Sequence, residues 1–128
     1  MNFFKNKDYF STGILTRKEA TSYVRISLVN LGENTEFVDY KVYNWNDEIP
    51  FVIESKVVQL DSYESKINDV NIVSMCYGDR LDANLYEVRL SLIHNKSVIA
   101  SICEIGNSKV YNEGNTIFHS QLNPIKYR

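Results

Sequence analysis

The sequence predicts a single all-β domain, an antiparallel β-sandwich of jelly-roll or immunoglobulin-like type with about seven or eight strands. Three observations predict it. The chain of 128 residues contains nine Tyr and six Phe, and aromatic and β-branched residues favour strands. Short segments in which apolar and polar residues alternate recur along the chain, with turn residues between them. No segment has the helical pattern that a crossover between parallel strands needs, so we expect antiparallel sheets.

Strands with clear alternation begin after residue 22. In the first of them Val24, Ile26 and Leu28 alternate with polar residues, and Asn30 opens a turn. Further strands are expected at residues 37–45, 51–60, 70–77, 85–93, 98–105 and 116–122. The polar segment 61–68 is expected to form a loop or a short helical turn. Asn residues recur at the expected turns, where we expect them to adopt the unusual backbone dihedrals that such turns need.

Residues 1–22 are predicted to form an N-terminal arm, and residues 23–128 the sandwich domain. The arm is polar but carries spaced apolar side chains, namely Phe3, Phe4, Tyr9, Phe10, Ile14 and Leu15. Thr16 and Glu19 match a capping box, which predicts one helical turn. Exposed aromatic side chains are unfavourable, so we expect the arm to dock on its own domain or on another copy. Docking on another copy would add a strand to a sheet edge, and such head-to-tail contacts produce filaments when they do not close.

The balance of charge argues against two classes of partner. The chain has 14 basic and 16 acidic side chains and a net charge of -2, whereas nucleic-acid-binding domains carry a basic surface. No apolar stretch approaches the ~20 residues of a transmembrane helix. We therefore expect no nucleic-acid partner and no insertion into a membrane.

The first residues, Met1 to Asp8, lack the apolar region of a secretory signal peptide. We expect the protein to have no signal peptide and to be made in the cytoplasm. Display on a spore or cell surface would then use a route that needs no signal, such as lysis of the cell that made it.

Candidate catalytic and metal-binding groups are sparse. His94 and His119 lie far apart in the sequence, and neither has a second ligand at metal-binding spacing. No Ser occupies a nucleophile elbow, and no glycine-rich loop precedes a helix. Cys76 and Cys103 fall in expected strands. They could be two buried free thiols, form a disulfide between neighbouring strands, or form a disulfide between chains. We expect no enzyme activity, no metal and no cofactor.

Aromatic residues cluster at positions 40–45. Alternation places Tyr40 on one face of the strand and Tyr43 with Trp45 on the other, so one of these sets should be core. Aromatic rings at a protein surface also offer a stacking platform with a polar edge. Tyr43 and Trp45 are therefore candidates for a ligand platform, and core packing is the alternative.

Four segments carry a resemblance to a known group of proteins. They are Phe10-Ser11-Thr12-Gly13, Val24-x-Ile26-x-Leu28-Val29-Asn30-Leu31-Gly32, Val42-Tyr43-Asn44-Trp45 and Tyr86-Glu87-Val88. In this order they resemble small β-sandwich proteins of spore-forming Firmicutes, including spore-surface and appendage subunits. The resemblance implies a non-enzymatic surface or appendage role. Appendage subunits of this kind carry cysteines in the N-terminal arm for cross-linking, whereas this arm has none.

Together these observations predict a structural protein that self-assembles, with the arm as the interface of a homo-oligomer or polymer. The expected assembly is a fibre, an appendage or a surface layer of a bacterial cell or spore. The alternative is a small carbohydrate- or protein-binding sandwich that uses Tyr43 and Trp45.

Overall fold

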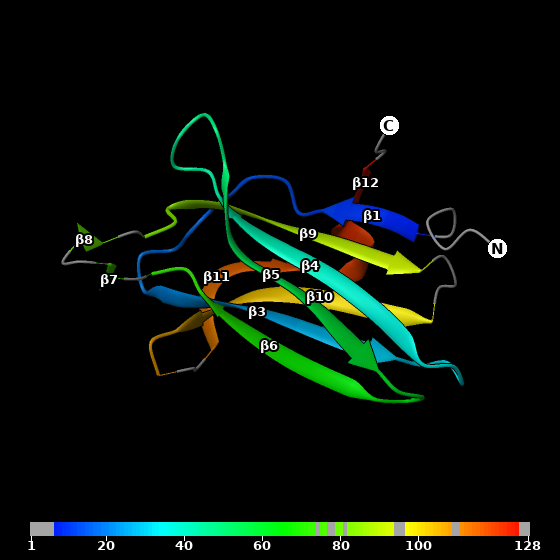
Figure 1. Cartoon of the computed structure of the whole chain (residues 1–128). Helices are drawn as coiled ribbons and strands as arrows, with labels where there is room; N and C mark the ends of the chain where they lie inside the picture. The colour runs from blue at the N-terminus through cyan, green and yellow to red at the C-terminus, as the bar shows by residue number, and fades with distance from the viewer. Residues whose placement is uncertain are drawn as a thin grey trace.

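Two antiparallel sheets packed face to face make up most of the protein (Figure 1). The structure is a computed structural model that describes residues 7–73, 75–76, 79–80, 82–93, 97–108 and 111–125. The β-sandwich predicted from the sequence is confirmed. Within the described ranges, no helix has the length and apolar character needed to cross a membrane.

The larger sheet has six strands. They are β1 (Lys7–Ser11), β2 (Leu15–Thr16), β4 (Glu36–Asn44), β5 (Phe51–Leu60), β9 (Leu85–Ile93) and β12 (Asn123–Ile125). The strand order is β12-β1-β9-β4-β5, and β2 pairs with the other end of β9, beyond β1. Strand β9 therefore lies in the middle of this sheet, and β5 forms one of its edges.

The smaller sheet has four strands in the order β11-β10-β3-β6. They are β3 (Thr21–Asn30), β6 (Ser65–Asn71), β10 (Val98–Gly106) and β11 (Tyr111–Ile117). Two further short strands, β7 (Met75–Cys76) and β8 (Asp79–Arg80), pair with each other, and η2 (His119–Gln121) is one 3₁₀ turn. Strand β6 is an edge of this sheet, and a four-residue turn joins it to β5.

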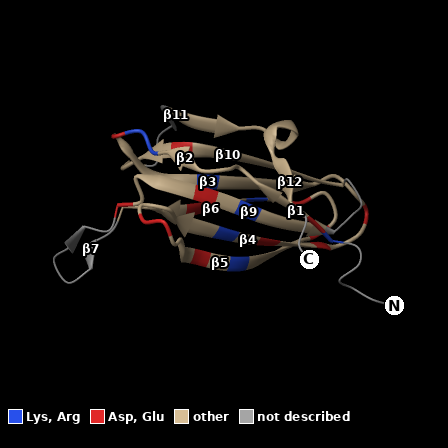
Figure 2. Cartoon of the chain, turned by 90° about the horizontal axis from the view of Figure 1, so that it is seen from above, with Lys and Arg blue, Asp and Glu red and all other residues tan. Residues whose placement is uncertain are grey.

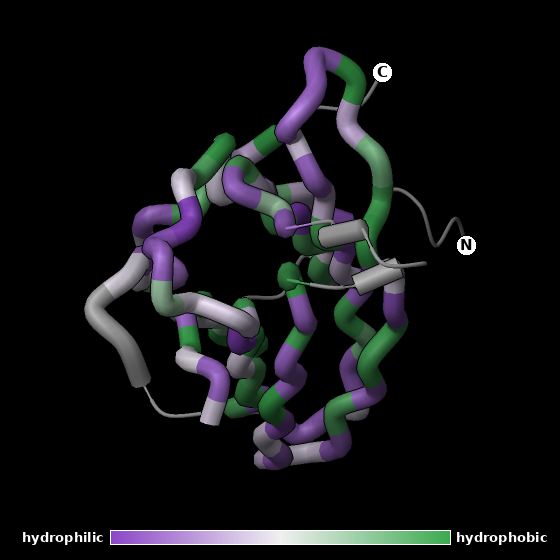
Figure 3. The backbone as a smooth tube through the Cα atoms, turned by 90° about the vertical axis from the view of Figure 1, so that its left-hand side faces the viewer, coloured by the Kyte–Doolittle hydropathy of each residue, from purple (hydrophilic) through white to green (hydrophobic). Residues whose placement is uncertain are grey.

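The core lies between the sheets and follows the alternation seen in the sequence. In Figure 3, hydrophobic and hydrophilic residues alternate along the strands. Val24 and Ile26 of β3 are fully buried, whereas Arg25 between them is partly exposed on the other face. Val88 and Leu90 of β9 face them from the larger sheet with 0% and 1% exposure. Burial of these side chains supplies the main favourable free energy of folding.

Strand β6 corrects the prediction for the polar segment 61–68, because residues 65–68 belong to a strand. The expected strand at 70–77 is also wrong in extent, since β6 ends at Asn71. Asp69 forms an ion pair with Arg25 on β3, with 2.8 Å between Oδ1 and Nε. An edge strand that pairs with one neighbour needs few apolar residues, and Val70 is the residue of β6 that is buried.

Two other boundaries differ from the prediction. The strand expected at 116–122 ends earlier, because β11 covers Tyr111–Ile117 and is followed by η2. The helical turn expected from Thr16 does not form: Leu15 and Thr16 pair with β9, and a single turn follows, in which the Thr21 N–H donates to the Lys18 carbonyl at 2.9 Å. Pairing with a central strand satisfies two backbone groups that one isolated helical turn would leave without partners.

The described part of the arm docks on its own domain. Strand β1 pairs with β9 on one side and with β12 on the other. Phe10 and Leu15 pack against the core, and Ile14 is 54% exposed. Phe3 and Phe4 lie outside the described residues.

Candidate binding groove

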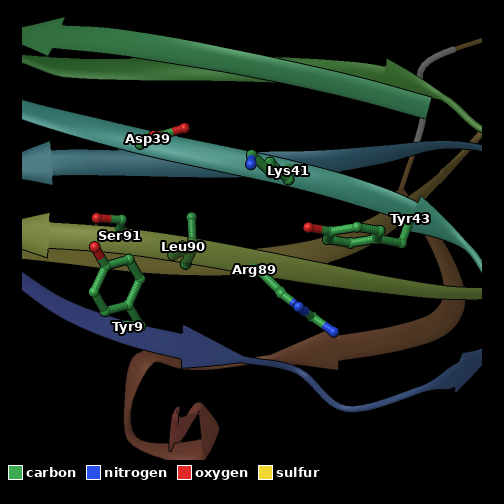
Figure 4. A pocket seen from close by; sticks show the side chains of 7 residues that line it. All are labelled: Tyr9, Asp39, Lys41, Tyr43, Arg89, Leu90 and Ser91. Atoms are coloured by element: carbon green, nitrogen blue, oxygen red, sulfur yellow. The ribbon is translucent and has the colours of Figure 1, made fainter. Parts of the chain in front are cut away.

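A groove of about 420 Å³ crosses the outer face of the larger sheet (Figure 4). It lies over β1, β9 and β4. Its lining residues are Tyr9, Asp39, Lys41, Tyr43, Arg89, Leu90 and Ser91. In Figure 4, Tyr9 and Tyr43 stand at opposite ends, and the charged side chains lie between them. The volume falls in the range of small-molecule sites, roughly 300–1,000 Å³.

The register of the strands brings these residues together. Ser91 of β9 lies opposite Tyr9 of β1 on one side and Asp39 of β4 on the other. Two residues along the strands, Arg89 lies opposite Lys41. Directly opposite side chains on one face are about 5 Å apart at Cβ, so this register places polar groups from three strands in one small area.

Ser91 lies in the middle strand of this area and is 8% exposed. Its Oγ has no hydrogen-bond partner among the described residues. A buried hydroxyl without a partner costs free energy, so such groups are rare and call for a physical explanation. Ser91 lines the groove, with its Oγ buried beneath the groove surface.

Asp39 and Lys41 add an acceptor and a cation to the groove. Within the described part of the chain, neither side chain makes a hydrogen bond or an ion pair. Asp39 is partly buried and Lys41 is exposed. Both charged groups are therefore available to a ligand without breaking an existing contact.

Arg89 and Tyr43 form the other end of the groove and hold each other in place. The guanidinium carbon of Arg89 lies 4.6 Å from the centroid of the Tyr43 ring, which is a cation–π contact. Arg89 Nε also donates to Glu87 Oε2 at 2.9 Å. These contacts restrict the rotamers of both side chains, which lowers the entropic cost of ordering them around a ligand.

Glu87 of β9 lies opposite Tyr43 and is buried, at 5% exposure. Its carboxylate accepts hydrogen bonds from Arg89, from Ser11 Oγ and from Trp45 Nε1, the last at 2.8 Å. Burial by itself raises the pKa of Glu87, but the three hydrogen bonds outweigh it and lower this pKa below its ordinary value. The carboxylate is therefore ionised at neutral pH and positions Arg89.

The structure places the predicted platform residues on one face, as alternation indicated. Tyr43 lines the groove, and Trp45 lies beside it, tied to Glu87 rather than lining the groove. Tyr40, on the opposite face, is 1% exposed and belongs to the core. Sequence reasoning missed Tyr9, Asp39, Lys41, Arg89 and Ser91 as partners of Tyr43, because only strand pairing brings them together.

The other predicted site residues lie elsewhere. Cys103, on β10, is a free thiol and is partly exposed, and burial is the main cause that raises its pKa. The side chain of Cys76 lies outside the described residues. His119 packs near Phe10, with 6.0 Å between ring centroids, and its Nδ1 accepts a hydrogen bond from the backbone of Ala100. Across the described residues, no group of three or more His, Cys, Asp or Glu side chains is placed to hold a metal ion.

A second polar cluster, also missed, surrounds Glu104 of β10, which is fully buried. Its carboxylate accepts hydrogen bonds from Thr21 Oγ1 at 2.5 Å, from the backbone N–H of Lys18 at 2.9 Å, from Tyr86 OH at 2.7 Å and from Asn115 Nδ2. The sequence signal was a single Glu within an otherwise apolar strand. With four donors around it, this carboxylate is satisfied within the protein, which is typical of a structural role.

The groove thus offers hydrogen-bond donors, hydrogen-bond acceptors and two tyrosine rings. No protein-family model matches this chain, and no curated protein and no solved structure matches it either.

Proposed function

We propose that the protein is a non-enzymatic binding domain whose groove holds a short carbohydrate. The observation that carries this proposal is the buried Ser91 hydroxyl without a partner, between Tyr9 and Asp39. A sugar hydroxyl both donates and accepts, so it matches Ser91 and either charged neighbour at once.

The mixed charge of the groove favours a neutral polyhydroxyl ligand over an anion. Lys41 and Arg89 are cationic, but Asp39 lies in the same groove and Arg89 is already paired with Glu87. An anion would meet the Asp39 carboxylate, whereas a neutral ligand can accept from Lys41 and donate to Asp39. The aromatic rings at the two ends supply apolar surface for the C–H faces of a sugar.

Binding can be tested with a glycan array followed by titration of the best glycan. Trp45, the single tryptophan, donates to Glu87, which holds Arg89 of the groove, so its fluorescence should change on binding. Asp39→Asn should weaken the affinity by about tenfold or more, because it removes a charged acceptor. An array without any bound glycan would overturn the proposal.

Ser91→Ala separates binding from stability. It should lower the affinity for the glycan and leave the melting temperature unchanged or slightly raised, because it removes a buried hydroxyl that has no partner. Asp47→Asn, an equivalent change in an exposed loop, is the matched control for Asp39→Asn and should leave binding unchanged. Equal affinities for wild type, Ser91→Ala and Asp39→Asn would show that the glycan binds elsewhere.

Our second candidate function is a self-assembling structural subunit of a fibre, appendage or surface layer. The observation that favours it is the pair of sheet edges, β5 and β6, which lie next to each other at one side of the sandwich. The resemblance to spore-surface proteins supports the same proposal. Because β1 is an inner strand, the part of the arm available as a connector in this proposal is residues 1–6, including Phe3 and Phe4.

Electron microscopy of the full chain tests this second candidate. Regular filaments or sheets that disappear after deletion of residues 1–6 would support assembly through the arm. Isolated particles from the full chain would contradict assembly, and filaments that persist in the deletion variant would contradict the role of the arm.

A further inference from the structure

Strand β5 has a free edge whose backbone groups and charged side chains play no part in the groove. Strand β5 is ten residues long and pairs with β4 on one side, and it is the last strand of the larger sheet. On such a strand, every second residue directs its N–H and C=O away from the sheet, which makes it a template for another strand. In Figure 2, β5 lies at the margin of the molecule and carries an acidic and a basic band close together.

The two charged residues of β5 are Glu54 and Lys56. Lys56 Nζ lies 3.5 Å from Asn68 Oδ1 on β6, and Glu54 accepts a hydrogen bond from Tyr40 OH. Neither side chain forms an ion pair with any described residue. Two opposite charges, two residues apart on one face of an edge strand, thus lack charged partners among the described residues.

The segment Glu54-Ser55-Lys56 is complementary to itself when read in the reverse direction. If a second copy pairs antiparallel with its two-fold axis at Ser55, Glu54 of each copy lies opposite Lys56 of the other. A register shift at Ile53 ends the regular part of β5 next to this segment. We propose that β5 is a dimer interface whose occupant is a second copy of this chain, paired antiparallel about Ser55.

The charges select this register against its neighbours. A shift of the pairing by two residues in one direction places Lys56 opposite Lys56 of the second copy. A shift in the other direction places Glu54 opposite Glu54. Like charges directly opposite each other destabilise a strand pair, whereas opposite charges stabilise it. A lysine on an edge strand usually discourages pairing, and here the nearby glutamate permits pairing in one register.

The exposed apolar side chains of β5 agree with a covered edge. Val57 is 61% exposed and Val52 is 47% exposed in the protomer. Val57 lies opposite Asp39 on the outer face, so a second strand along this edge would withdraw part of its apolar surface from water.

The dimer goes beyond the proposed ligand binding. The contact uses the same strand on both copies, so it is isologous and closes after two subunits. The two larger sheets join into one continuous sheet, and each protomer brings its groove on β1, β9 and β4, next to the contact, since Lys41 lies opposite Ser55. A multivalent glycan could then engage both grooves, which raises the apparent affinity without any new contact.

Charge variants of the full chain test the interface. By sedimentation velocity, wild type should be a dimer. Lys56→Glu and Glu54→Lys should each be monomeric, since each places two like-charged pairs across the two-fold axis and should weaken the dimer by at least tenfold. An equimolar mixture of these two variants should recover dimers, because every cross-strand pair in the heterodimer is again of opposite charge.

Matched controls make the outcome decisive. Lys7→Glu makes the same charge change on β1, three strands away from β5, and should remain dimeric. Circular dichroism should give the same spectrum for all variants. A monomeric wild type, dimers in both single variants, or a mixture that stays monomeric would each overturn the proposal. These results do not depend on ligand binding, so the two proposals can fail separately.

Discussion

Glu104 illustrates how a single buried charge is held in this fold. The carboxylate has no described cation beside it, and hydrogen bonds from Thr21, Tyr86, Asn115 and the Lys18 backbone take that place. Burial raises the pKa of Glu104, and the hydrogen bonds outweigh it and lower this pKa below its ordinary value. Tyr86 responds in the opposite sense, since burial and the neighbouring carboxylate raise its pKa.

The lowered pKa values of Glu104 and Glu87 predict a loss of stability in acid. A group whose pKa is lower in the folded state stabilises the protein fully above its unfolded-state pKa, which is about 4.3 for Glu. This contribution is lost as the pH falls through the folded-state values, so the free energy of unfolding should decrease below about pH 4 to 5. Urea denaturation at a series of pH values measures it. Glu104→Gln should flatten this dependence, and an unchanged slope in that variant would contradict the assignment.

Gly114 is predicted to be required because of the same carboxylate. A Cβ added at this position would lie 2.6 Å from Cδ and 2.8 Å from Cβ of Glu104, closer than side chains approach each other. Gly114→Ala should therefore destabilise the protein by about 1–3 kcal/mol through overpacking. Gly13→Ala is a useful comparison, since Gly13 has open space around it and its φ of 72° is the source of strain. Thermal unfolding of Gly114→Ala with Glu104→Ala tests the cause, because removing the Glu104 carboxyl group should remove the part of the effect that comes from the contact with Cδ, while the contact with Cβ remains.

The Asn residues at turns act through their side chains and not, as predicted, through unusual backbone dihedrals. Among the described residues, Tyr63, with φ of 57°, is the non-glycine residue with a positive φ, so the Asn residues there do not supply unusual dihedrals. Asn30 instead uses its side chain, which donates to the Asn34 carbonyl at 2.7 Å and accepts from the Gly32 N–H at 2.9 Å. The prediction was wrong about the mechanism, because Asn stabilises turns by either route.

At the scale of elements, strand β1 is part of the folding unit. It fills the position between β12 and β9, and Thr12 beyond its end exchanges hydrogen bonds with Val88. Removing it would expose the edge of β9 and leave β12 without a neighbour in the sheet. The arm that sequence reasoning separated from the domain is, over residues 7–16, a structural part of the larger sheet.

Two deletions are expected to separate the contribution of residues 1–6 to stability from that of β1. Deletion of residues 1–6 should leave the melting temperature almost unchanged, because β1 remains. Deletion of residues 1–15 should abolish cooperative unfolding or lower the melting temperature strongly, since Phe10 and Leu15 leave the core with it. Near-ultraviolet circular dichroism during heating measures both. A stable, cooperative domain after the longer deletion would contradict the integral role of β1.

At the scale of the whole molecule, the two sheets are joined by polar contacts as well as by the core. Tyr86 of the larger sheet donates to Glu104 of the smaller one, and Asn115 Nδ2 donates to the carbonyl of Thr16 at 2.7 Å. These contacts lie at one end of the sandwich. A buried, fully hydrogen-bonded network restrains how one sheet packs on the other.

Tyr86→Phe should loosen this end. It leaves the Glu104 carboxylate with one donor fewer, and the expected cost is about 1–3 kcal/mol of unfolding free energy. Hydrogen exchange should show faster exchange near β2 and β11, while the backbone amides of β3 and β4 at the other end stay protected. Tyr63→Phe, at an exposed turn, is the matched control for the loss of a hydroxyl. Uniformly faster exchange along all strands would argue against a local clamp.

The sequence by itself determined the class of fold and most strand positions. The alternation of buried and exposed residues is a local property of each strand, so Val24 to Leu28 and the strand around Val88 could be assigned without knowing their neighbours. The same alternation placed Tyr40 in the core and Tyr43 on the outer face. Residues 65–68 could not be predicted as a strand in this way, because they are mostly polar and belong to an edge strand, so they show little alternation of apolar and polar residues.

Only the tertiary structure decided the candidate sites. The groove depends on which strands are neighbours and in which register, and Tyr9, Ser91 and Asp39 are far apart in the sequence. The position of β5 at a free edge is likewise a property of strand order. Strand order is set by the packing of the whole core, since many pairings satisfy the same local alternation and only one buries all the apolar faces together.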